Sequence, residues 1–299
     1  MQCKNQTIQE HTHQFFSIVK KRRERDRPEF PTGFKCIDDV TDGLHRGEVW
    51  VIAGKTGGGK TTLSLQIAKR ISDNPSHSVL FLSLEMKGWE LVARMFCSMF
   101  GFEYVKVMKG ILPDDYIQKK EHFEEYLNSI DFEIFEYGYS WTEVESIIRN
   151  AYKSKKPDVI FIDFIQLVEW KGFGNQRLAL MEYIRKLKEL AKTLDIAIVV
   201  VSQLRRPPSG ADVNRPPDIV DLMGSGSIEQ TSDKVIIVIK KIEGQGESEN
   251  ITYYFKLAKN RQGETMFKEV WFQGQYYRFT EDIPREVQDI LNITGGTLA

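Results

Sequence analysis

The chain has 299 residues, with 41 lysines and arginines against 42 aspartates and glutamates, so its formal net charge is −1. This balance excludes a protein whose overall charge attracts nucleic acid, and any such binding must be local. Cys3, Cys36 and Cys97 form no CxxC pair and the five histidines are scattered, which indicates neither a disulfide framework nor a zinc site. No apolar run approaches membrane-spanning length, so we expect a cytoplasmic protein without membrane contact.

The first 30 residues predict an arm that carries one amphipathic helix. Over residues 7–24, Ile8, Phe15, Ile18 and Val19 form an apolar stripe before the sequence turns basic. A Pro-punctuated linker, "DRPEFPTG", follows the helix. A lone helix cannot bury its own stripe, so this one must dock either on its own domain or on a neighbouring molecule. Both options remain open at this stage.

From residue 48 onward, apolar strands alternate with helices, which is typical of βαβ units and a mainly parallel sheet. After residue 233 only strands are predicted, and we expect them to extend the same sheet in antiparallel fashion. This pattern predicts one α/β domain over residues 31–280, with a tail over 281–299. The predicted strands are 48–54, 78–85, 132–135, 158–164, 196–203, 234–240, 251–260, 266–272 and 275–279, and the helices are 61–72, 88–99, 114–129, 141–153 and 177–194.

The stretch "VIAGKTGGGKTT" over residues 51–62 matches G-x-x-x-x-G-K-[ST], between a predicted strand and a predicted helix. Glycines let successive N–H groups point at phosphate oxygens, and the helix N-terminus adds partial positive charge. The alternative, a plain glycine turn, does not account for the flanking strand and helix. We therefore expect ATP with Mg²⁺ here, with Lys60 on the β- and γ-phosphates and Thr61 on the metal. The predicted nucleotide-binding residues are Gly54, Lys55, Thr56, Gly57, Gly58, Gly59, Lys60, Thr61 and Thr62.

Three further residues follow predicted strands that end at the edge of the sheet where the glycine-rich loop lies. Asp163 is the expected second metal anchor, because its carboxylate can hold Mg²⁺ through water. Glu85 closes the strand 78–85 and is the expected base for the attacking water. Gln203 ends the strand 196–203, where its amide can sense the γ-phosphate. The alternative for each is a polar residue that happens to end a strand.

Lys259 and Arg261 stand two apart near the end of a predicted strand, so their side chains project to one side. Two such cations before a turn are usually solvated. They could also reach the triphosphate of an adjacent subunit, where an arginine finger is worth about 10³ to 10⁵ in rate. The pattern alone leaves both interpretations open.

Two basic loops leave the same edge of the sheet and are predicted to bind single-stranded nucleic acid. Local positive charge, glycines and an aromatic ring, Phe173, suit a strand whose backbone and bases are both accessible. The alternative is a pair of solvated loops. The predicted basic contacts are Lys171 and Arg177 in the first loop, and Arg205, Arg206 and Arg215 in the second.

Five stretches together resemble one family: "SLEM" at 83–86, "DFIQL" at 163–167, "SQL" at 202–204, "GSGSIEQTSD" at 224–233 and "AKNRQG" at 258–263. In this order they resemble the RecA-type motor domain of the DnaB replicative helicases over about residues 30–280. The resemblance implies a RecA-like P-loop NTPase in which Lys60, Thr61, Glu85, Asp163 and Gln203 serve one nucleotide site. It also implies a homohexameric ring around single-stranded DNA, moving 5′ to 3′ in DNA replication.

The resemblance assigns Lys259 and Arg261 to the basic pair that reaches the neighbour's γ-phosphate. It implies that the helix at 7–24 docks on the next subunit, and that loops at 169–177 and 205–226 line the channel. Met223 and Gly224 stand where the family commonly has an Arg-Glu pair, so contacts to DNA there fall to the backbone of Ser225 and Gly226. Primase and a helicase loader are possible partners by resemblance.

The family's N-terminal helical domain has no counterpart in this sequence. This predicts either the motor part of a longer chain or a short homologue from a virus or mobile element. Two rival hypotheses remain: a RecA-like regulatory or recombination ATPase that binds DNA or protein without unwinding, and a nucleotide-binding assembly module without useful hydrolysis.

Overall fold

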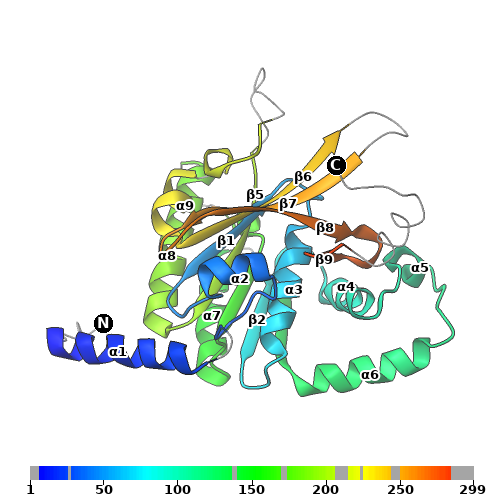
Figure 1. The fold of residues 1–299 in the computed structure, drawn as a ribbon, viewed down its shortest axis with the longest axis horizontal. Coiled ribbons are helices and arrows are strands. Elements are labelled where there is room, and N and C mark those ends of the chain that lie inside the picture. The colour runs from blue at the N-terminus through cyan, green and yellow to red at the C-terminus, as the bar shows by residue number, and fades with distance from the viewer. Residues whose placement is uncertain are drawn as a thin grey trace.

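The computed structural model describes residues 7–25, 28–136, 140–169, 174–205, 215–222, 225–243 and 250–283. Within these ranges a nine-stranded sheet has the order β3-β2-β4-β5-β1-β6-β7-β8-β9 (Figure 1). The strands are β1 Val49–Gly54, β2 Ser78–Ser83, β3 Asp131–Glu136, β4 Val159–Asp163, β5 Ala197–Gln203, β6 Lys234–Glu243, β7 Asn250–Asn260, β8 Met266–Gln273 and β9 Arg278–Thr280. The α-helices are α1 Ile8–Glu24, α2 Lys35–Thr41, α3 Lys60–Ser72, α4 Gly88–Phe100, α5 Tyr104–Met108, α6 Tyr116–Ser129, α7 Trp141–Ser154, α8 Gln176–Leu194 and α9 Ser225–Thr231.

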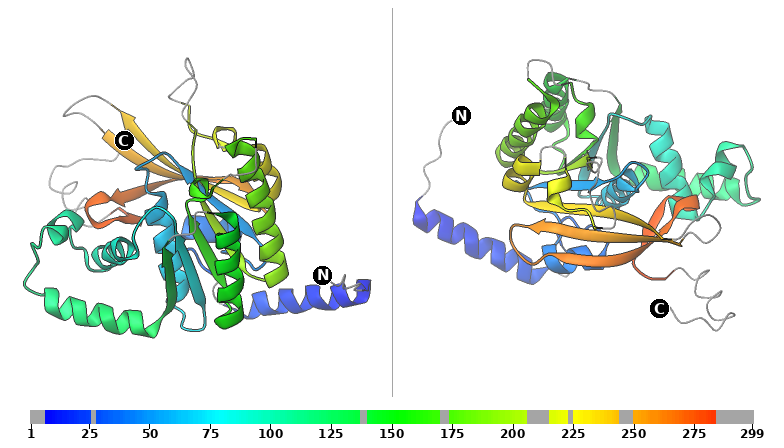
Figure 2. Two further views of the ribbon diagram at one scale, coloured as in Figure 1. Left: turned by 180° about the vertical axis from the view of Figure 1, so that it is seen from behind. Right: turned by 90° about the horizontal axis from the view of Figure 1, so that it is seen from above.

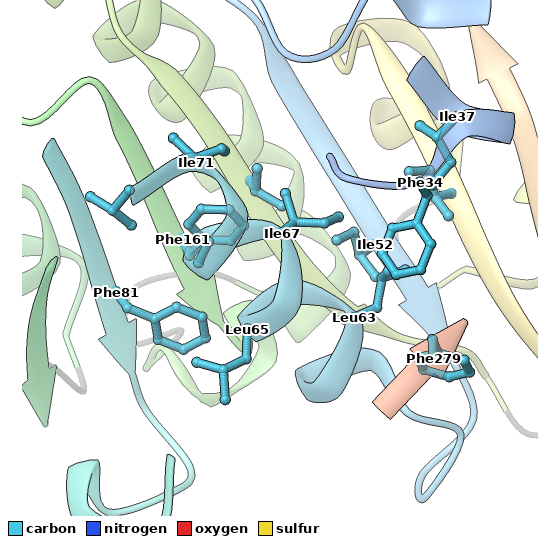
Figure 3. Packing of buried hydrophobic residues seen from close by; sticks show 14 of the residues in the cluster. Phe34, Ile37, Ile52, Leu63, Leu65, Ile67, Ile71, Phe81, Phe161 and Phe279 are labelled. Carbon is cyan, nitrogen blue, oxygen red and sulfur yellow. The ribbon is translucent and has the colours of Figure 1, made fainter. Parts of the chain in front are cut away.

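The sheet is covered by helices on both faces, and successive residues of β1 face opposite cores. Trp50 and Ile52 join the core beneath α2, α3, α4 and α6. Val49 and Val51 join the other core, beneath α7, α8 and α9. Figure 3 shows α3 packing its apolar side chains between the strands and the chain segments that carry Phe34 and Phe279. The helix that begins at the glycine-rich loop is therefore fixed from several sides.

The predicted mainly parallel α/β fold, with antiparallel strands at its C-terminal end, is confirmed. One detail was wrong: β6 runs parallel to β1, and antiparallel pairing begins only between β6 and β7. The long connection from β5, which includes α9, allows the crossover that a parallel strand needs. The predicted strand 275–279 was also wrong in part, because Gly274–Tyr276 forms a 3₁₀ turn before β9. Helices α2, α5 and α9 were not predicted.

A buried ion pair holds β6 beside β1. Lys234 is fully buried, and its ammonium donates to both carboxylate oxygens of Glu48, at 2.9 and 2.8 Å. The Trp50 indole donates to the same carboxylate at 2.7 Å, and Trp50 pairs with Lys234 across the strands. Burial alone would raise the pKa of Glu48, but His45, Lys234 and Trp50 outweigh it and lower the pKa to about 2.

Helix α1 projects from the body of the molecule (Figures 1 and 2). A capping box of Thr7 and Glu10 begins it, and none of its residues is buried. Phe15 and Phe16, which belong to its apolar side, are 58% and 62% exposed. Docking on its own domain, one of the two options left open by the sequence, is therefore not what the structure shows. Within the described part of the chain, no helix is both long and apolar enough to span a membrane.

We predict that Lys234→Met lowers the free energy of unfolding by about 3–5 kcal/mol at pH 7, because it leaves a buried carboxylate without its cation. Urea unfolding measures the change. The control is Arg185→Met, which removes a half-exposed ion pair with Glu182 on α8 and should cost less than about 1 kcal/mol.

The pH dependence of this difference follows from the lowered pKa of Glu48. A lowered pKa gives stability that is present above the unfolded value of 4.5 and lost as the pH falls towards about 2. The gap between wild type and Lys234→Met should therefore shrink over that window. A gap that stays constant down to pH 2 would contradict the assignment of the ion pair.

Candidate nucleotide site

The glycine-rich loop connects β1 to α3 in a conformation that only glycine accommodates at Gly59. Gly59 has a φ of 92°, and a Cβ there would lie 2.5 Å from the ring of Phe279. The Gly58 N–H donates to the Lys55 carbonyl at 3.0 Å, which closes the turn before the helix. The loop thus presents its backbone and the first turn of α3 to the same space, as phosphate binding requires.

Parallel pairing brings four strand ends to the edge of the sheet beside this loop. Gly54 at the end of β1 pairs with Gln203 at the end of β5, and Ser83 at the end of β2 pairs with Asp163 at the end of β4. A pocket of about 590 Å³ opens there. Its walls include Thr56, Lys60, Thr61, Glu85, Arg94 and Gln203. The pocket therefore brings Glu85 and Gln203 together with most of the predicted nucleotide-binding residues. Its lining does not include Gly54, Lys55, Gly58 or Asp163.

Asp163 is buried next to the loop and has the properties of a metal anchor. Burial raises the pKa of Asp163 to about 6, opposed by a hydrogen bond with the Thr61 side chain and reinforced by the charge of Glu85. Its Oδ1 atom is buried without a hydrogen-bond partner. An orphaned carboxylate oxygen beside a hydroxyl suits Mg²⁺, which typically takes one or two protein ligands together with substrate phosphates. The residues present therefore fit this ion.

Lys60 begins α3, and its ammonium donates to the Lys55 carbonyl at 3.0 Å. Burial lowers the pKa of Lys60, while the charges of Asp163 and Glu85 oppose the shift. The ammonium of Lys60 is thus held by an uncharged acceptor, the carbonyl of Lys55. A phosphate would supply it with a full countercharge.

Glu85 lies in the turn after β2 rather than at the strand end, because β2 stops at Ser83. Two hydrogen bonds shape this turn: the Ser83 hydroxyl donates to the Met86 carbonyl at 2.5 Å, and the Leu84 N–H donates to the Asp163 carbonyl at 2.7 Å. The first closes the turn and the second ties it to β4, and the Glu85 side chain is exposed at the pocket. The carboxylate is accessible to a water molecule in this position.

Gln203 is tied to the glycine-rich loop by a direct hydrogen bond. Its Nε2 donates to the Thr56 hydroxyl at 2.6 Å. The amide of Gln203 is thereby coupled to a residue of the glycine-rich loop, and Gln203 itself lines the pocket. This contact was not foreseen from the sequence, because it joins residues 147 positions apart.

Arg94 and Tyr277, which were not predicted from the sequence, form another wall of the pocket. The Arg94 guanidinium lies 4.2 Å from the centre of the Tyr277 ring, and its Nε is buried without a partner. Tyr104 meets the same ring edge-on at 4.9 Å. A signal existed for Arg94, which is the only basic residue in the apolar sequence of α4, but none marked Tyr277.

Lys259 and Arg261 lie across the sheet from the pocket of their own chain. Lys259 pairs with Val235 near the start of β6, whereas Gly54 pairs with Val238 further along. The Lys259 ammonium donates to the carbonyls of Glu229 and Ser232. Burial lowers the pKa of Lys259, opposed by the charge of Asp233 and reinforced by that of Arg261. The Arg261 side chain is 60% exposed, and its nearest carboxylate oxygen, on Asp233, is 3.6 Å away.

The predicted DNA contacts are only partly within the described ranges. Arg177 is exposed in the first turn of α8, and Arg205 is exposed directly after β5. Arg215 forms hydrogen bonds of 2.6 and 2.8 Å to the carboxylate of Asp221, so its charge is partly compensated. Ser225 and Gly226 begin α9. Lys171, Phe173, Arg206, Met223 and Gly224 lie outside the residues that the structure describes.

Comparisons with known proteins identify this arrangement. Over 252 residues the chain is 32% identical to a probable plasmid replicative DNA helicase of Chlamydia trachomatis, covering 84% of this chain and 54% of that protein. It is 28% identical over 262 residues to the replicative DNA helicase DnaC of Bacillus subtilis, covering 86% and 57%. The chain therefore spans about half the length of the curated relatives it matches.

Two solved structures have the same fold. One is an ATPase domain that superposes with a TM-score of 0.79 at 25% identity, covering 91% of this chain and 98% of that one. The other, a DnaB-like replicative helicase studied for its interactions with primase, gives 0.76 at 25% identity, covering 89% and 66%. The family model of the DnaB-like helicase C-terminal domain matches residues 29–281, and the chain belongs to this family.

Proposed function

We propose that this chain is an ATP-driven motor of a replicative helicase that works as a homohexameric ring around single-stranded DNA. The observation that carries the proposal is the single pocket where the glycine-rich loop, Glu85 and Gln203 meet, with Asp163 buried beside it. Family membership supports helicase chemistry for a pocket of this composition.

In the proposed reaction, the loop and Lys60 hold the β- and γ-phosphates. Glu85 accepts a proton from the water that attacks the γ-phosphorus, and the bond to the β-phosphate oxygen breaks to release ADP and phosphate. Gln203 hydrogen-bonds the γ-phosphate through its side-chain amide. When that phosphate is lost, the hydrogen bond from Gln203 to Thr56 transmits the change to the glycine-rich loop. Mg²⁺, held by Thr61 and Asp163, would neutralise charge on the phosphates when bound.

A second subunit is proposed to complete each site. Lys259 and Arg261 lie at the sheet edge opposite the pocket of their own chain, so they can serve a pocket only from an adjacent subunit. Arg261 is exposed enough to do so. In a ring every chain offers its loop on one side and its basic pair on the other, which is a head-to-tail contact that closes on itself.

The exposed apolar side of α1 supports the same assembly. Apolar side chains are also exposed around α5 and the start of α6, among them Val105, Ile111 and Ile117. Two unpartnered apolar surfaces on one chain are unusual for a monomer. We propose that α1 of one subunit docks on a neighbour, and that residues 1–30 act as the arm, 31–280 as the motor and 281–299 as the tail.

DNA is proposed to bind where both loops leave the pocket edge, through Lys171, Arg177, Arg205, Arg206 and Arg215 and through the backbone of Ser225 and Gly226. These loops follow the strands that end in Asp163 and Gln203, so hydrolysis and DNA contact share the same elements. Primase and a loader remain proposed partners, and 5′ to 3′ movement rests on the family resemblance. The rival hypothesis, an ATPase that binds DNA without unwinding, shares the pocket but predicts no strand separation.

We predict that Lys60→Ala lowers the rate of ATP hydrolysis by at least about 10²-fold, because the phosphates lose their cation in the transition state. The control is Lys69→Ala, a lysine near the other end of α3 that should leave the rate unchanged. Wild type should hydrolyse ATP faster with single-stranded DNA and unwind a forked duplex. Unstimulated hydrolysis without unwinding would instead favour the rival hypothesis.

Subunit mixing tests whether the basic pair acts in trans. Arg261→Ala and Lys60→Ala should each be inactive, because one lacks the finger and the other the phosphate cation. In a random equimolar ring, about a quarter of the interfaces combine an intact loop with an intact finger. Activity should therefore reappear on mixing and grow with the exchange of subunits. Two inactive variants that stay inactive when native mass spectrometry shows mixed rings would exclude action in trans.

Asp163→Asn should separate stability from activity. The raised pKa means that burying the ionised carboxylate has a cost that is absent below the ordinary value of 3.8 and complete above about 6. In EDTA at pH 8, the neutral amide should raise the free energy of unfolding by about 1–3 kcal/mol. The same variant should lose hydrolysis with Mg²⁺. A less stable variant at pH 8 would contradict this account.

A further inference from the structure

The structure assigns a positioning role to Gln166, whose side chain bonds to the end of β5 beside the nucleotide pocket and whose backbone carbonyl bonds to the first residue of α8. This inference rests on the proposed function, because α8 carries Arg177, one of the proposed DNA contacts. Gln166 lies in the 3₁₀ turn Ile165–Leu167, directly after the strand that ends in Asp163.

The side chain of Gln166 is fastened to β5. Its Nε2 donates to the Ser202 hydroxyl at 2.7 Å, and more weakly to the Gln203 carbonyl at 3.4 Å. A carbonyl can only accept, so the amide must turn its NH₂ towards β5. The opposite atom, Oε1, is then buried without a hydrogen-bond partner. The amide is therefore held in one orientation, in which its NH₂ group donates hydrogen bonds and its oxygen accepts none.

The backbone of Gln166 is fastened to α8. Its carbonyl accepts from Nε2 of Gln176 at 3.2 Å, and Gln176 is the first residue of that helix. Arg177 follows directly. On the other side, Gln203 donates to Thr56 in the phosphate loop at 2.6 Å. Gln166 thus links Gln203, which contacts the glycine-rich loop, to Gln176, which begins α8.

The chemistry of this junction suits coupling rather than stability alone. A fully satisfied network would resist change, whereas a buried unpaired acceptor leaves an alternative arrangement open. When the Gln203 amide follows the γ-phosphate, the end of β5 and the Ser202 contact can shift with it. Gln166 would pass that shift to Gln176 and so to the position of Arg177.

The test compares ATP hydrolysis with and without oligo-dT for wild type and Gln166→Met, which keeps the length of the side chain and removes its amide. We expect the DNA-independent rate to stay within about twofold, while the stimulation by DNA falls at least about fivefold, the lower end of usual coupling between sites. A separate binding measurement tests the same link: the affinity for oligo-dT should differ less between ADP and a non-hydrolysable ATP analogue in Gln166→Met than in wild type.

Gln176→Met, near the surface, serves as a second variant should Gln166→Met fold poorly, and thermal unfolding checks both. If the two glutamines form one chain, the double variant should be no worse than either single variant. The control is Gln66→Met, which removes a half-buried glutamine amide on α3 that bonds to Phe279 and should leave the stimulation intact.

Three results would overturn the inference: stimulation that survives in Gln166→Met, basal and stimulated rates that fall by the same factor, or effects of the two variants that multiply. The first would show that the junction carries no signal, and the second that Gln166 merely shapes the pocket. A wild-type chain that shows no stimulation by DNA would overturn the proposed function itself, and this inference with it.

Discussion

The parallel alignment of β2, β4, β5 and β1 is the constraint on which the rest of the structure depends. Each strand is buried on both faces, so its interior positions carry mainly apolar side chains, and the buried Ser202 next to the end of β5 is paired with Gln166. Polar side chains that bind ligands lie where the strands end, and parallel strands all end at the same edge of the sheet. The glycine-rich loop, Glu85, Asp163 and Gln203 are therefore neighbours because of strand direction, although they are spread over more than half of the sequence.

That arrangement has an energetic cost at Asp163. Its carboxylate is buried, has an orphaned oxygen and a raised pKa, and lies near the negative charge of Glu85. A core built for stability alone would place an apolar residue here. A buried charge that destabilises one residue, beside a well-packed α3, is expected where a cation and phosphates complete the site.

The sequence predicted the fold and most of the pocket because those features follow short-range rules. The glycine-lysine-threonine pattern, the apolar strands and the acid or amide at each strand end can be recognised locally. Contacts between distant residues were out of reach: the bond from Gln203 to Thr56, the stacking of Arg94 on Tyr277, and the direction of β6. An apolar run indicates burial on both faces but not direction, which in this fold depends on the crossover through α9 and the buried pair of Lys234 with Glu48.

The positions of Lys259 and Arg261 follow from the topology of the sheet. Strand β7 runs antiparallel to β6 and so ends at the edge of the sheet where β1 begins, which places the basic pair at the edge opposite the glycine-rich loop. The same sheet thus has a loop at one edge and cations at the other. In the proposed ring, a second copy in the same orientation brings its cations to the loop of its neighbour. In the proposed assembly, the topology of one chain accounts for sites that lie between subunits. It also places Gln166 between the end of β5 and the first residue of α8, the helix that carries the proposed DNA contact Arg177.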